Sequence, residues 1–274
     1  MSSILTNNSA MVALQTLKTV NNNLAKTTDE ISTGKSVAKA KDNSAIWGIS
    51  KVMESDVAGF QAVSDSLALG ESTVAVASAG AEQITELLTE MKQKVVAATG
   101  ENVDHAKLTA DVDELKNQIS SIISASQFNG SNLLNTAGGD ITVLSSIDRD
   151  ATGSVSAANI TVASVDFEGN LVLTDVDVSS ATAADASIAT IEAHIQTAVD
   201  GAAALGASAK RIEDQGEFVG KVMDAMKSGV GALVDADMEE ASARLQALQV
   251  QQQLATQSLS IANQAPNAVL SLFR

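Results

Sequence analysis

The 274-residue chain has no cysteine, no tyrosine, one proline and one tryptophan. Without cysteine, the chain can form neither a disulfide nor a thiolate site. Aromatic residues make up 2% of the sequence, whereas a compact enzyme usually carries more aromatic surface around its substrate pocket. Since proline is so rare and straight-chain residues are common, the composition favours long helices.

Charged residues make up only 18% of the sequence, and they are unevenly distributed along it. The net charge of −16 argues against a nucleic-acid-binding protein, which would present basic surface to phosphates. Residues 1–45 carry five lysines against three acids, whereas residues 140–200 carry ten acids against Arg149 alone. This asymmetry predicts a solvated middle segment between ends that are more buried.

The sequence predicts neither a membrane span nor a cleaved signal. No run of about 18 apolar residues occurs, which is the length that a spanning helix needs. The first residues, MSSILTNNSAMVALQ, lack the basic and apolar regions of a secretory signal. A cytoplasmic protein and a substrate of a signal-independent export route both remain compatible with this pattern.

Periodicity predicts a mainly α fold with a small β-rich insert. Helices are expected over 5–33, 44–99, 104–126, about 183–231 and 235–264. The last of these is expected to be capped by Asp235. Alternating β-branched runs at 141–144, 159–165 and 171–178 predict strands. Three glycines fall eleven residues apart on nearly one face of the second helix and predict close packing against another helix: Gly48, Gly59 and Gly70.

Both ends of the chain carry apolar heptads. The N-terminal seam consists of Ala13, Leu17, Val20, Leu24, Thr27 and Ile31. The C-terminal seam consists of Leu245, Leu248, Gln252, Ala255, Leu259 and Ala262. No charged residue occurs from Leu245 to Phe273, and seven glutamines fill polar positions there. Since surface helices normally carry Lys or Glu, this pattern predicts burial among neighbours and pairing of the two ends.

Residues that could support catalysis or metal binding are nearly absent. The chain has two histidines, His105 and His194, and neither has a partner at ligand spacing, so both are expected on the surface. Residues 148–153 resemble the start of a calcium loop, but Asn159 stands where that loop needs glutamate. The sequence therefore predicts no catalytic residue, no metal site and no cofactor.

Several motifs resemble those of bacterial flagellins. The resemblance rests on Ile4, Thr6, Asn7, Ala10, Ala13, Leu14 and Leu17, on ISTGK at 31–35, AKDNSA at 40–45, QFNGSNLL at 127–134, LGA at 205–207, RIE at 211–213 and ANQAPNAVLSLFR at 262–274. It covers about residues 1–139 and 183–274. It implies a terminal coiled-coil domain (1–35 and 235–274), a helical core domain (36–139 and 183–234) and an outward-facing β-rich insert (140–182).

The resemblance also implies a role and a route. The chain would be a secreted structural subunit that polymerises with itself into the flagellar filament, its terminal helices folding on assembly. Its implied partners are the flagellar type III export apparatus, an export chaperone, the filament cap and the hook-junction proteins. Assembly residues are expected in the seams: Leu17, Val20, Leu24, Ile31, Leu245, Leu248, Leu259 and Phe273. The alternatives are a hook–filament junction protein and a cytoplasmic helical adaptor.

One segment departs from the family pattern. Many flagellins resemble one another in an L-Q-R-x-R-E-L-A stretch that a mammalian toll-like receptor binds. Here Glu90 stands in place of an arginine and Lys94 in place of a leucine, while Asp111 stands where the pattern has an acid on the next helix. The resemblance therefore implies weak recognition by that receptor.

Overall fold

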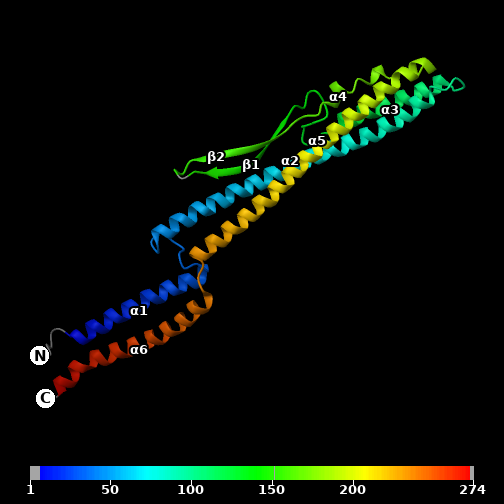
Figure 1. Ribbon diagram of the computed structural model, residues 1–274. Coiled ribbons are helices and arrows are strands. Elements are labelled where there is room, and N and C mark those ends of the chain that lie inside the picture. Colours follow the sequence, from blue (N-terminus) through cyan, green and yellow to red (C-terminus); the bar gives the residue numbers. More distant parts are fainter. Residues whose placement is uncertain (1–6, 151, 272–274) are drawn as a thin grey trace. The chain divides into compact units, whose positions relative to one another are not determined.

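The computed structural model describes residues 7–150 and 152–271, with side chains described as far as residue 264. The elements in chain order (Figure 1) are α1 (Asn8–Thr33), α2 (Ser44–Ala97), α3 (His105–Ala125), β1 (Ile141–Arg149), β2 (Val155–Val162), α4 (Phe167–Asn170), the 3-10 turn η1 (Leu173–Asp175), α5 (Ala181–Val234) and α6 (Met238–Ser271). This architecture confirms the predicted mainly α fold with a small antiparallel sheet. Within the described residues, no helix is both long and apolar enough to span a membrane.

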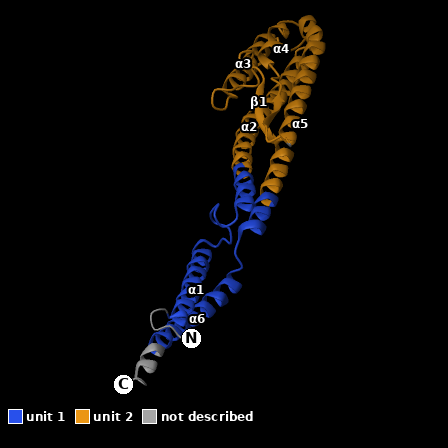
Figure 2. Cartoon of the chain, turned by 90° about the vertical axis from the view of Figure 1, so that its left-hand side faces the viewer, with its two compact units in different colours: residues 1–55, 225–274 blue, residues 56–224 orange. Residues whose placement is uncertain are grey.

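The chain forms two compact units (Figure 2). Unit 1 consists of residues 1–55 and 225–274, and unit 2 of residues 56–224. The two 54-residue helices α2 and α5 contribute residues to both units. Unit 1 thus contains the paired chain ends together with the adjoining turns of α2 and α5.

The core of unit 2 lies between α2, α3 and α5, which run side by side in Figures 1 and 2. Helix α3 begins at its cap, Asp104, whose carboxylate accepts a hydrogen bond from the Lys107 backbone N–H. Its apolar residues recur at three- and four-residue spacing, so one face is buried. Side chains that are fully buried in this core include Ile84, Leu88, Met91, Ile119, Ile191, Leu205 and Ile212.

The hairpin of β1 and β2 packs against α2 where the helix has glycine. The strands pair from Ile141 opposite Val162 to Arg149 opposite Val155. A Cβ on Gly70 would lie 2.5 Å from a methyl carbon of Val143. The expectation that the spaced glycines admit another helix is therefore wrong for Gly70, because a strand side chain fills that position.

The other two glycines behave differently from each other. A Cβ on Gly59 would lie 3.2 Å from Ile147 Cδ1, so this position also meets the hairpin. A Cβ on Gly48 would meet no atom within 4 Å. Near Gly59, Arg149 Nε donates to both carboxylate oxygens of Asp56 at 3.1 Å, which ties the end of β1 to α2.

The predicted strand at 171–178 is wrong. The segment contains η1, and its backbone groups are bound by side chains of α3 and α5 instead of a neighbouring strand. For example, Ser187 Oγ on α5 accepts from the Asp177 N–H and donates to the Asp177 carbonyl, both at 2.9 Å. Alternation of β-branched residues describes a strand only where a partner strand is available.

Two smaller expectations are also wrong. Asp235 does not cap α6: the carboxylate of Asp237 accepts from the backbone N–H groups of Glu239 and Glu240, at 2.9 and 3.1 Å. The backbone of Asp235 instead forms an isolated antiparallel β-bridge with that of Lys35. His194 is not a surface residue, since it is only 9% exposed.

The glycines allow a direct test of hairpin packing. Gly70→Ala is expected to destabilise unit 2 by roughly 1–3 kcal/mol, because Val143 must shift to admit the new methyl group. Gly220→Ala on α5 is the matched control, since its Cβ would meet nothing within 4 Å. That substitution is expected to stabilise by about 0.5–1 kcal/mol through helix propensity. Urea unfolding of the monomer measures both, and equal effects would contradict the packing described here.

Candidate functional site

Helices α1 and α6 form an antiparallel pair in unit 1, and the predicted heptad residues make the seam between them (Figure 1). In α1, Val20 is 7% exposed and Thr27 2%. In α6, Leu248 is 7% exposed and Ala255 9%. The other predicted seam residues are half-buried: Ala13, Leu17, Leu24, Ile31, Leu245, Gln252, Leu259 and Ala262. Phe273 lies outside the described residues.

Uncharged polar side chains fix how the two helices align. Gln252 occupies a seam position, and its amide nitrogen donates to the side-chain oxygen of Asn21 at 2.8 Å. Near the start of α1, Asn7 caps the helix by accepting from the Ala10 N–H and also donates to the carbonyl of Ala262 at 2.7 Å. A polar residue at a seam position disfavours shifted alignments, because a shift would leave its amide without a partner.

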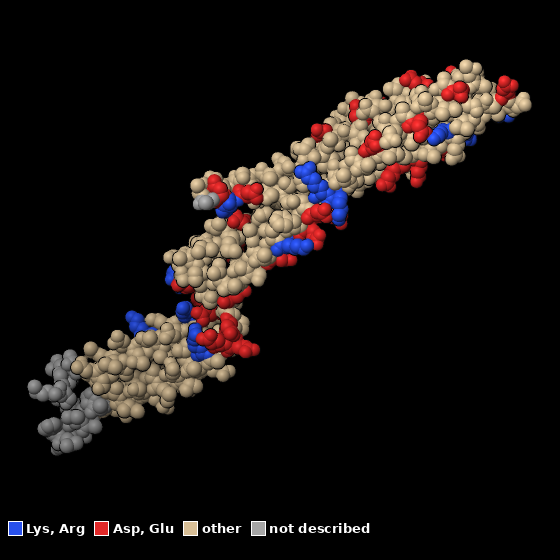
Figure 3. All heavy atoms as spheres, viewed as in Figure 1, with Lys and Arg blue, Asp and Glu red and all other residues tan. Residues whose placement is uncertain are grey.

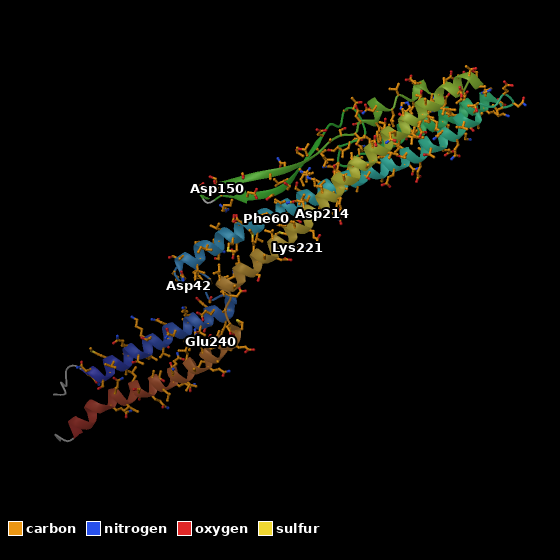
Figure 4. The ribbon with its side chains drawn as sticks, in the orientation of Figure 1. Asp42, Phe60, Asp150, Asp214, Lys221 and Glu240 are labelled. Carbon is orange, nitrogen blue, oxygen red and sulfur yellow. The ribbon has the colours of Figure 1, made fainter. Side chains whose placement is uncertain are left out.

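Apart from Lys18, the charged residues of the pair gather at the end where α1 stops and α6 begins. Gly34 ends α1 in a left-handed conformation (φ 70°) that glycine adopts without strain. Glu30 is nearby, within 4.0 Å of Arg244 and 3.8 Å of Lys26. Beyond the turn, the Ser36 N–H donates to the Val234 carbonyl at 2.7 Å. Glu240 in the first turn of α6 belongs to the same charged region (Figure 4).

Helix α6 also presents a second apolar stripe that sequence analysis missed, and the start of α1 carries exposed apolar side chains. On α6, three exposed side chains lie roughly opposite the seam: Val250 (56%), Leu254 (59%) and Ile261 (69%). On α1, Met11 (62%), Val12 (63%) and Leu14 (58%) are exposed within the first two turns. On α6, the spacing of four and seven residues repeats the helical period, so the sequence contains the signal of this stripe.

Away from the charged end, the surface of the α1–α6 pair carries almost no charge, as Figure 3 shows on the face that it draws. No acid or base lies in α6 after Arg244. A groove of about 430 Å³ between the helices is lined by Asn8, Ser9, Val12, Ala13, Thr16, Ala255 and Ser258. These side chains offer no general acid, base or nucleophile paired with a base.

The part of the chain that the structure describes holds no group of three or more acids and histidines that could bind a metal ion. Of the residues that resemble a calcium loop, Asp148 and Arg149 belong to β1, and Asp150 lies just beyond the end of that strand (Figure 4). Its carboxylate accepts from the Thr152 hydroxyl and from the Ser154 N–H at 2.8 Å. These hydrogen bonds hold the pKa of Asp150 below its ordinary value, and they occupy an oxygen that a calcium ion would use.

The two positions that depart from the receptor-binding pattern lie on α2 in unit 2. Glu90 is exposed. Lys94 is half-buried, and its ammonium donates to Asp111 on α3 at 2.8 Å. The hydrogen bond and charge of Asp111 raise the pKa of Lys94. Asp111 is therefore engaged by a lysine within the chain.

The sequence matches known proteins along most of its length. Residues 4–138 match the bacterial flagellin N-terminal helical region, and residues 188–273 match the bacterial flagellin C-terminal helical region. Flagellin FljO of Caulobacter vibrioides is 40% identical over 277 residues, covering 100% of this chain and 99% of the relative. A flagellin of Brucella melitensis is 39% identical over 282 residues, covering 100% of both chains.

Similarity to solved structures is weaker. The crystal structure of Bacillus cereus flagellin is 21% identical, with a TM-score of 0.48, covering 56% of this chain and 86% of that one.

Proposed function

Because the chain belongs to the bacterial flagellin family, we propose how its paired ends build the flagellar filament, of which it is a structural subunit. The observation that carries the proposal is a second set of apolar side chains on α6, away from the seam. One stripe of α6 forms the seam with α1. The other, which includes Leu254, is exposed on a helix with no acid or base after Arg244 and is the part that neighbouring copies would cover in the polymer.

The seam alone buries too little apolar surface to stabilise the folded helix pair strongly. Val20 and Leu248 are its only large apolar side chains below 9% exposure among the described residues of α1 and α6. Burying such a side chain contributes about 1.5–3 kcal/mol, whereas ordering the backbone costs about 1–2 kcal/mol for each residue. Isolated helices without further packing are marginal in water. The terminal helices would therefore become fully ordered when neighbouring copies cover their exposed apolar side chains.

Both seam and outer stripe would contribute to assembly. Leu17, Leu24 and Leu259 are among the predicted assembly residues whose side chains the structure describes. They would shape the helix pair that a neighbour contacts. Outer-stripe residues would make the contact itself. We retain the division into a terminal domain (1–35 and 235–274), a core domain (36–139 and 183–234) and an insert (140–182) as part of this proposal.

The route and partners follow from the family. The subunit would leave the cell through the flagellar type III apparatus, with an export chaperone, and would add to an extracellular filament beneath a cap. Hook-junction proteins would meet the first subunits. The full-length match to named flagellins favours this role over a hook–filament junction protein. Abundance in sheared culture supernatant distinguishes the two, because a junction protein forms only a short zone.

Placing a charge in either stripe should block assembly. Leu259→Asp in the seam and Leu254→Asp in the outer stripe are both expected to abolish filaments, since each puts a carboxylate where the polymer excludes water, at several kcal/mol. Leu24→Asp should behave like Leu259→Asp. Negative-stain microscopy of secreted protein measures the result, and circular dichroism checks that the helical core remains folded.

The control for these variants is Leu259→Met, which conserves volume and should form filaments. Normal filaments from Leu254→Asp would eliminate the outer stripe as a contact. Normal filaments from Leu259→Asp would show that the seam is dispensable for assembly.

Coupled folding also predicts a protease pattern. Trypsin should cut the monomer early at Lys18, Lys26, Lys35 and Arg244, since backbone that opens readily is where proteolysis concentrates. A resistant fragment of roughly residues 42–244 should remain, and filaments should resist cleavage at the same sites. Mass spectrometry identifies the cuts. Equal cleavage of monomer and filament would contradict folding on assembly.

Weak recognition by the toll-like receptor is a separate prediction from the family pattern. Glu90 reverses a charge at a position where relatives have arginine, and loss of such an interface residue costs about 2 kcal/mol or more. Lys94 also engages Asp111, the acid that the pattern would present. Depolymerised protein is therefore expected to signal poorly in a reporter-cell assay.

The variant Glu90→Arg with Lys94→Leu restores both positions and releases Asp111, and it should increase signalling. Lys94→Leu alone is the control that frees Asp111 while keeping the reversed charge. Strong signalling by the unmodified chain would refute the prediction.

A further inference from the structure

Both histidines of the chain lie against one short segment, residues 171–178, which we term the strap. From α3, Lys116 Nζ donates to the Val176 carbonyl at 2.9 Å, and His105 Nδ1 lies 3.1 Å from the Val178 carbonyl oxygen. From α5, Ser187 binds the Asp177 backbone. The strap is thus held to two helices by side chains, where a strand would be held by a ladder of backbone hydrogen bonds.

His194 lies beneath the strap in an environment that favours the neutral ring. It is 9% exposed, and its Nε2 has no hydrogen-bond partner among the described residues. Burial lowers the pKa of His194, while a hydrogen bond to the Val172 backbone and the charge of Asp175 act in the opposite direction. A protonated ring would carry a second N–H donor without an acceptor, which is costly in a buried site.

No charged side chain of the strap or of the described helices is hydrogen-bonded to His194 Nε2. Asp175 on the strap is the side chain whose charge acts on the ring, and this effect is smaller than that of burial. On α3, Lys116 pairs with Asp113 at 3.2 Å. Across α2 and α5, Lys92 and Glu192 pair with each other at 2.5 Å.

We propose that the strap is an acid-released latch, in which protonation of His194 expels the ring and frees residues 171–178 from α3 and α5. Release would expose three side chains that are now at most 5% exposed: Leu171, Val176 and Val178. Unit 2 would then present new apolar surface in mildly acidic surroundings while its long helices persist. His105 differs from His194 in that its ring is half-buried and its Nδ1 faces the Val178 carbonyl oxygen.

The direction of the pH dependence follows from linkage. His194 binds its proton more weakly in the closed strap than in the released one, so the released form takes up the proton. Stability of the closed strap is therefore constant above the ordinary histidine pKa of 6.5. It falls as the pH falls through 6.5 toward the lower pKa of the closed form.

The full-length monomer can be tested in two ways. Histidine labelling for NMR gives only two ring signals, and the His194→Gln spectrum assigns them by losing one. The His194 signal is expected to titrate below pH 6.5. Hydrogen exchange measured at pH 7.5 and pH 5.0, corrected for the intrinsic rates, should show strap amides exchanging at least tenfold faster at the acidic pH.

Two variants separate titration from simple packing. His194→Gln cannot titrate and should make strap exchange nearly independent of pH. His105→Ala is the matched control: it removes one contact with the strap, so exchange should rise equally at both pH values while the acid response persists. The proposal is overturned by a His194 pKa at or above 6.5, by equal strap exchange at both pH values, or by an undiminished acid response in a folded His194→Gln variant. The NMR titration of the unmodified chain decides the matter if that variant does not fold.

Discussion

The pairing of α1 with α6 depends on apolar residues that recur at alternating intervals of three and four. A helix that contacts one neighbour can bury only one stripe of its surface. In unit 2, by contrast, α2 contacts α3, α5 and the hairpin, and residues such as Ile84, Leu88 and Met91 are fully buried. In the α1–α6 pair no large apolar side chain reaches that level among the described residues. The same helical geometry therefore gives a self-sufficient core in one unit and an incomplete one in the other.

Local periodicity explains which parts of this arrangement could be read from the sequence. All twelve predicted seam positions lie on the facing sides of α1 and α6, because a heptad specifies a face whatever its partner is. The strap could not be read in this way. Its alternating residues satisfy a strand pattern, and the outcome depends on side chains such as Lys116 and Ser187, which lie far away in the sequence.

Glycine spacing and acidic composition also fail to identify which element will pack against a given residue. The spacing of Gly59 and Gly70 predicted packing against another helix, whereas both positions meet the hairpin, because spacing carries no information about which element approaches. Composition likewise made residues 140–200 look solvated throughout. Their acids mark only the outer faces, since Phe167 and Val178 from the same acidic segment are buried at 0% and 1% exposure. A short segment can hold both kinds of residue when its neighbours are helices on one side and water on the other.

The distribution of charge is consistent with the role proposed for the helix pair in a polymer. Lys26, Glu30 and Arg244 gather where α1 ends and α6 begins. The side chains of Lys26 and Arg244 are 62% and 52% exposed, and that of Glu30, at 12%, lies within 4.0 Å of both. Farther along α6 the polar positions are glutamines, whose amides lose less on leaving water than a charged group does. Such a surface can be exposed in the monomer and covered in the filament without an unpaired charge being buried. The amide of Gln252 bonded to Asn21 meets the same requirement inside the seam, where it opposes slippage of one helix along the other. Helix α6 therefore carries no charge beyond Arg244 that would have to be buried if further copies packed against it, as proposed above.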